Sequence, residues 1–90
     1  SKLSAIAGHQ VSITIITFEE RLSGWYVQLR QARDADPLTR AYAGLEQTLE
    51  FVRSTSVLPF SRTAVDRYFS LRQMFPRHGK QDLKIAAIVL

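Results

Sequence analysis

The chain has no cysteine, which excludes a disulfide framework and zinc sites built on thiolates. This absence fits a reducing, cytoplasmic setting. The longest apolar stretches, residues 11–18 and 83–90, are too short to cross a membrane, because a membrane-spanning helix needs about 20 residues. Neither stretch has the flanking pattern of a signal peptide.

Several common catalytic motifs are also missing. The sequence contains no glycine-rich phosphate loop, no His-x-x-x-His pair and no Gly-x-Ser-x-Gly turn around a nucleophilic serine. These motifs mark nucleotide hydrolases, zinc proteases and esterases. The sequence therefore gives no support to any of these three enzyme classes.

What is present fits one small soluble domain. The chain has 90 residues, of which 46% are apolar and 22% are charged, an ordinary balance for a globular protein. Twelve lysine and arginine residues against eight aspartate and glutamate residues give a net charge of +4. This charge favours a polyanion or an acidic protein as partner without choosing between them.

The first half of the chain predicts a strand followed by two helices. Residues 11–18 form a β-branched run typical of a buried strand. Thr17 with Glu20 three residues later matches a capping box, which predicts a helix from there to about residue 33. Asp36 and Pro37 suit the start of a second helix. We expect this helix to run for roughly four turns, antiparallel to the first, because apolar residues follow at helical spacing: Leu38, Tyr42, Leu45, Leu49 and Val52.

The second half predicts a short strand at residues 56–60, a helix capped by Ser61 and ended by Pro76, and a last helix opened by Asp82. This alternation predicts a parallel sheet in which residues 11–18 and 56–60 are neighbours, joined by the helical hairpin. Two strands are few for such a sheet. Because the chain also begins without a methionine and stops inside an apolar helical stretch, we expect a fragment of a larger domain.

Two segments resemble a known family. Ser12 to Glu20, with Gly24 four residues later, resembles the second strand and helix start of PIN domains, where a Thr-x-x-Glu element supplies an acidic metal ligand. Asp82 to Ala87 resembles the later Asp-x-x-Ile-Ala-Ala helix start of the same family. The hairpin, strand and helix between them follow the family's order. The resemblance covers essentially the whole chain and is closest to the VapC-like toxins of prokaryotes.

The resemblance implies a single partial PIN-like domain over residues 1–90, with a three-layer α/β/α sandwich around a parallel sheet that is incomplete in this chain. It also implies an endoribonuclease toxin of a type II toxin–antitoxin pair, dependent on magnesium or manganese, with Glu20 and Asp82 as metal ligands and catalytic residues. The implied partners are RNA such as tRNA, a cognate antitoxin and a second copy of the chain, all in the cytoplasm. The family's first and last acidic elements are absent from these 90 residues.

Carboxylates such as Glu20 and Asp82 suit the chemistry of a metal-dependent ribonuclease. Magnesium prefers oxygen ligands and keeps several waters, one of which it activates for attack on a phosphodiester. In open α/β sheets these acids converge outside the carboxyl ends of the strands. Two acids hold the ion only weakly, so we expect the isolated chain to be almost inactive. The alternatives are a catalytically inactive PIN-fold fragment or interaction module, and a small basic helical binding protein unrelated to PIN domains.

Basic residues cluster before and after Asp82. Arg77, Lys80 and Lys84 are candidate ligands of the RNA phosphates, together with Arg72 and His78. Each candidate also has an ordinary structural interpretation: the basic cluster as a solvated loop, Glu20 as a capping-box residue, and Asp82 as a helix-start acid. Four aromatic residues fall on helical stripes and are predicted to be core or interface residues rather than platforms for base stacking: Trp25, Tyr26, Tyr42 and Phe51.

Overall fold

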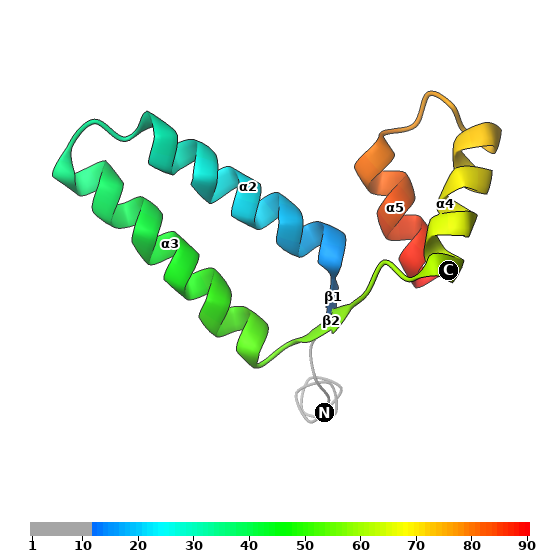
Figure 1. Cartoon of the computed structure of the whole chain (residues 1–90), viewed down its shortest axis with the longest axis horizontal. Helices are drawn as coiled ribbons and strands as arrows, with labels where there is room; N and C mark the ends of the chain where they lie inside the picture. Colours follow the sequence, from blue (N-terminus) through cyan, green and yellow to red (C-terminus); the bar gives the residue numbers. More distant parts are fainter. Residues whose placement is uncertain (1–11) are drawn as a thin grey trace, which may run out of the picture.

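A computed structural model describes residues 12–90 of the chain. Along the chain the elements are β1 (Ser12–Thr14), α2 (Ile15–Gln31), α3 (Ala35–Arg53), β2 (Ser56–Leu58), α4 (Arg62–Met74) and α5 (Lys80–Val89). The helices form two antiparallel pairs, α2 with α3 and α4 with α5, which open like a V from the short sheet between them (Figure 1).

The sheet consists of two parallel strands. Ser12 of β1 lies opposite Ser56 of β2, and Thr14 lies opposite Leu58. The α2–α3 hairpin makes the crossover between them, which confirms the predicted parallel pairing and its connection. Both strands are shorter than predicted, because residues 15–18 are helical and β2 ends at Leu58. Val11, the first residue of the predicted strand, lies outside the described residues.

The early start of α2 has a local cause. Thr14 is the N-cap, and its side-chain oxygen accepts a hydrogen bond of 3.1 Å from the backbone N–H of Thr17. A capping hydroxyl satisfies one of the free N–H groups of the first turn. The helical conformation also buries Ile16, which is 5% exposed. The predicted capping box of Thr17 and Glu20 is therefore wrong, and Glu20 lies in the second turn of the helix.

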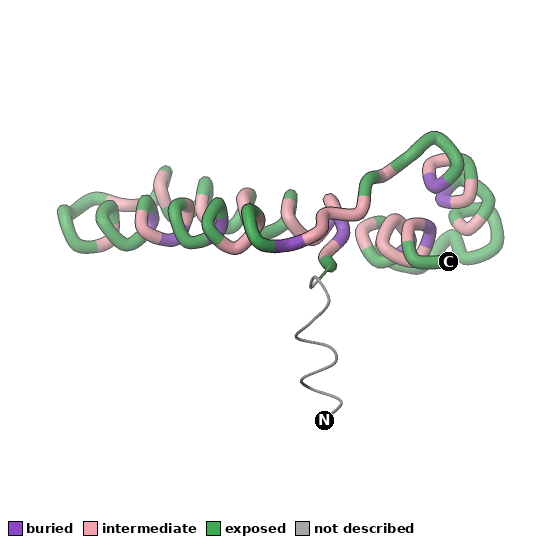
Figure 2. Tube along the Cα trace, turned by 90° about the horizontal axis from the view of Figure 1, so that it is seen from below, coloured by how far each residue is buried: buried purple, intermediate pink, exposed green. Residues whose placement is uncertain are grey.

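The predicted three-layer α/β/α sandwich is also wrong for this chain. The described chain is 75% helical and its sheet has only two strands. Three paired residues per strand offer too little surface for layers of helices on both faces, so the helices pack in pairs instead. The radius of gyration is 16.5 Å, against about 12 Å for a compact domain of this length. Buried positions are accordingly few in both arms of the V (Figure 2).

The contact between α2 and α3 rests on small residues. Ala41, Gly44 and Thr48 are the buried positions of α3, at the spacing of one helix face. A Cβ atom built at Gly44 would lie 2.5 Å from the indole carbons Cδ2 and Cζ2 of Trp25. Trp25 thus fills the space that a larger residue would need. Most of the predicted apolar stripe points elsewhere: Leu38, Tyr42 and Leu49 are 42%, 54% and 58% exposed, whereas Leu45 and Val52 are partly buried.

The α4–α5 pair has a small core of its own. Tyr68, Leu83 and Ala87 are buried together, with Phe60 and Leu71 packed against them. The Arg67 guanidinium donates a hydrogen bond of 2.5 Å from Nη1 to the carbonyl oxygen of Ala87, which ties the last turn of α5 to α4.

The helix boundaries in this half are close to those predicted. Ser61 caps α4 by accepting a hydrogen bond of 3.2 Å from the N–H of Ala64, which confirms its predicted role. α4 ends at Met74, two residues before Pro76. The start of α5 differs by two residues, because Gly79 is the N-cap and Asp82 lies within the first turn. No helix of residues 12–90 combines the length and the apolar character that a membrane span requires.

Candidate functional site

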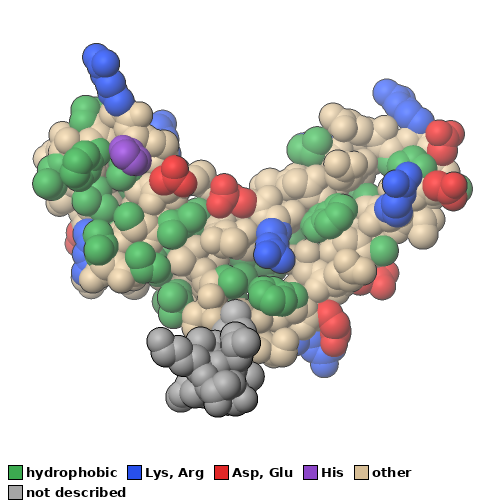
Figure 3. Space-filling view, turned by 180° about the vertical axis from the view of Figure 1, so that it is seen from behind, with side chains coloured by type: hydrophobic (Ala, Val, Ile, Leu, Met, Phe, Trp, Pro, Cys, Tyr) green, Lys and Arg blue, Asp and Glu red, His purple; other side chains and the backbone are tan. Residues whose placement is uncertain are grey.

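The two candidate acids lie near the starts of helices from different arms of the V, Glu20 in the second turn of α2 and Asp82 in the first turn of α5. Both side chains are exposed. These helices touch near their starts, because the Gln81 amide donates a hydrogen bond of 3.3 Å from Nε2 to the carboxylate Oε1 of Glu19. Acidic side chains accordingly gather at the notch between the two arms (Figure 3). This hydrogen bond thus joins the sequence neighbours of the two candidates and not the candidates themselves.

Glu20 and Asp82 themselves line different hollows. Glu20 lies at the edge of a hollow on α2 that also involves Trp25. Asp82 lies at the edge of a mainly apolar hollow between α4 and α5 beside Phe75 and His78. No group of three acidic or histidine side chains within residues 12–90 has the arrangement of a metal site. That Glu20 and Asp82 share one ion therefore stays a prediction.

Asp82 also has a structural role in its helix. Its carboxylate Oδ2 lies 3.5 Å from the position that a Cβ atom would take on Gly79, the N-cap of α5. The side chain thus folds back over the start of its own helix. A carboxylate there interacts favourably with the free N–H groups and the dipole of the first turn. This role is compatible with metal binding, since a carboxylate has two oxygens.

The basic candidates divide into two groups. Arg77 and Lys80 are exposed around the connection between α4 and α5, where a phosphate could reach them. Lys84 is half-buried, with its Nζ 5.8 Å from the centroid of the Tyr68 ring. The guanidinium carbon of Arg72 lies 5.9 Å from the same ring. Lys84 and Arg72 therefore make cation–π contacts with α4, and of the three candidates only Arg77 and Lys80 remain open.

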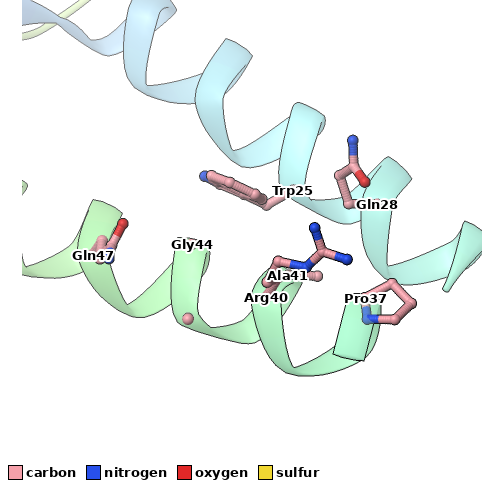
Figure 4. A pocket seen from close by; sticks show the side chains of 8 residues that line it. Trp25, Gln28, Pro37, Arg40, Ala41, Gly44 and Gln47 are labelled. Carbon is pink, nitrogen blue, oxygen red and sulfur yellow. The ribbon is translucent and has the colours of Figure 1, made fainter. Parts of the chain in front are cut away.

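The sequence interpretation missed a second set of polar residues, around Trp25. A hollow of 470 Å³ opens beside the indole between α2 and α3, with Arg40, Gln28 and Gln47 on its wall (Figure 4). A further hollow of 310 Å³ lies on the Phe51 side of the indole and includes Arg21. A glycine in the middle of one helix and a tryptophan in its partner were the only sequence signals for this close approach.

Comparison of the chain with models of known protein families found no match, and neither did comparisons with curated proteins and with solved structures.

Proposed function

We propose that this chain carries part of the metal site of an endoribonuclease similar to the VapC-like toxins, with Glu20 and Asp82 as carboxylate ligands of magnesium or manganese. The supporting observation is the hydrogen bond between Gln81 and Glu19. This bond joins the neighbours of both acids across the two arms, although 62 positions separate the two residues in the sequence.

The chemistry follows from the ion and the exposed charges. Glu20 and Asp82 would hold the hydrated ion, which would supply an activated water for hydrolysis of a phosphodiester. Arg77 and Lys80 would hold the phosphate backbone nearby. RNA as substrate, a cognate antitoxin as partner and a location in the cytoplasm belong to this proposal. Two acids give weak binding, so the 90 residues alone are expected to be almost inactive.

Manganese should report the shared site even without cleavage. Mn²⁺ added to ¹⁵N-labelled chain should broaden the amide signals at the starts of α2 and α5 at the same low metal concentration, because a paramagnetic ion acts on every nearby nucleus. A chelator should restore the signals. Glu20→Gln and Asp82→Asn should each reduce the broadening on both helices. Broadening confined to one helix, or unaffected by both substitutions, would contradict a shared site.

A second candidate function is that of an interaction module, and a separate observation favours it. Leu38, Tyr42 and Leu49 on α3 are each more than two-fifths exposed. Their spacings of four and seven residues place them on one side of the helix, at the period of a seam between two helices. Exposed large apolar side chains in such a row are typical of a surface that binds another helix.

Self-association is the first test of this surface. If a second copy covers the stripe, the wild-type chain should sediment as a dimer at micromolar concentration. Leu49→Lys should shift it to a monomer, because the substitution puts a charge into an apolar contact. Gln47→Lys adds the same charge to the same helix on the wall of the Trp25 hollows, and should leave the dimer intact. A monomeric wild type, or equal effects of the two substitutions, would exclude a second copy as the occupant.

A further inference from the structure

Three hollows on the α2–α3 arm share one residue, Trp25. The largest extends from the indole toward Pro37 and Arg40. The second extends toward Arg21 and Phe51. The third lies along α2 and ends at Glu20. These hollows form one open surface around the indole, which we call the Trp25 face.

Gly44 determines which part of the Trp25 indole is covered and which part is exposed. The glycine lets α3 pack closely on the indole and cover part of the ring, yet Trp25 remains partly exposed, with one hollow extending toward Arg40 and another toward Phe51. A tryptophan in a finished core would be enclosed by neighbouring side chains. The indole is therefore available to a planar ligand, although its helical position alone predicts a core residue.

Positive charge flanks the indole in both directions. Arg40 lines the hollow on one side, and Arg21 lines the hollow on the other, with its guanidinium carbon 5.2 Å from the centroid of the Phe51 ring. The ion pairs found within residues 12–90 join Arg53 with Glu50 and Arg62 with Asp66. Arg21 and Arg40 take part in neither pair. Both side chains are exposed, Arg40 toward its hollow and Arg21 against the Phe51 ring, where its guanidinium N–H groups can still bind a phosphate. Figure 3 shows exposed basic side chains at several places along the α2–α3 arm.

We propose that the Trp25 face binds single-stranded RNA, with a base against the indole and backbone phosphates on Arg21 and Arg40. Unpaired bases stack on aromatic side chains, and guanidinium groups bind phosphate oxygens. Gln28 and Gln47 add amide groups that can donate to and accept from base edges. This inference rests on the proposed ribonuclease function. It gives the RNA a path to the proposed metal ligand, because Glu20 lies at the end of the same face.

The chain contains a single tryptophan, so its fluorescence reports this face directly. Titration with a short oligouridylate in a chelator and low salt should quench the emission in a saturable way. Arg40→Gln should weaken binding at least about threefold and lower the salt dependence by about one phosphate contact. The matched control is Arg30→Gln, because Arg30 is an exposed arginine of α2 that lines none of the three hollows. This variant should bind like the wild type.

Three results would overturn the proposal: no quenching, equal weakening by the two arginine substitutions, or equally tight binding of oligoglutamate, which would indicate an acidic protein as ligand. Because the titration contains no free metal, its outcome is separate from that of the proposed function. Saturable quenching without any metal binding at Glu20 would retain the RNA site and reject the nuclease. Metal-dependent cleavage without quenching would retain the nuclease and reject the Trp25 face.

Discussion

Under the proposed function, Glu20→Gln and Asp82→Asn should each reduce metal-dependent RNA cleavage by the protein that carries this chain by on the order of 100-fold or more. An amide keeps the size of the side chain and loses its negative charge. The charge matters because a site with few acids depends on each of them to hold the ion against water. Cleavage of a total tRNA pool in magnesium, and again in manganese, measures the effect.

Three controls make this result specific. Glu46→Gln changes an exposed glutamate on α3 and should leave cleavage unchanged. Thermal unfolding should be nearly the same for Glu20→Gln and Glu46→Gln, since both residues are exposed and substitutions of exposed residues usually have small effects. Asp82→Asn should unfold at a slightly lower temperature, because it loses a favourable charge at the start of α5. Glu19→Gln tests the neighbour that contacts α5. If Glu19→Gln abolishes cleavage while Glu20→Gln does not, Glu19 replaces Glu20 as the ligand. Full activity in Asp82→Asn removes that residue from the site.

Gly44→Ala should lower the free energy of unfolding by about 1–2 kcal/mol. The new methyl group would lie 2.5 Å from two carbons of the Trp25 indole, so the large ring or the whole helix must move. Overpacking of this kind costs about 1–3 kcal/mol, and the better helix propensity of alanine offsets up to about 1 kcal/mol of that cost. Urea unfolding followed by circular dichroism gives the value.

Gly24→Ala is the matched control for this substitution. Gly24 lies inside α2, and a Cβ atom built there meets nothing within 4 Å apart from its chain neighbours and the backbone of its own helix. Its replacement should therefore raise the free energy of unfolding by about 0.5–1 kcal/mol through helix propensity alone. Opposite signs for the two alanine variants would establish the close approach of Trp25 and Gly44. Stabilisation by both would show that the indole does not pack on Gly44.

Much of the local structure could be predicted because it depends on local chemistry. Ser61 was identified as an N-cap from its residue type and position, and it caps α4. The parallel pairing of residues near Ser12 and Ser56 followed from a β-branched run and a short second strand separated by a helical hairpin. The strand lengths did not follow, because a threonine that can cap a helix and a run that suits a strand overlap at Thr14.

The rotation of α3 about its axis could not be predicted from its apolar pattern. The pattern centres on Leu38, Tyr42 and Leu49, but the helix turns Ala41, Gly44 and Thr48 toward α2 instead. The reason is steric, because the Trp25 indole needs the gap that Gly44 leaves. The prediction of the candidate site was incomplete for a similar reason. The sequence identified acids on two helices, whereas the hydrogen bond between those helices joins Glu19 and Gln81.

The placement of β1 before the hairpin and β2 after it has a consequence for the order of folding. Ser12 and Ser56 are far apart in the unfolded chain, so pairing them directly would carry the loop-closure entropy of the whole intervening segment. The α2–α3 contacts are local, and local contacts form quickly. Once the two helices have zipped together from their connecting turn, their other ends bring the strands into register. The sheet is then the last part of this arm to form, and the first to open when the hairpin loosens.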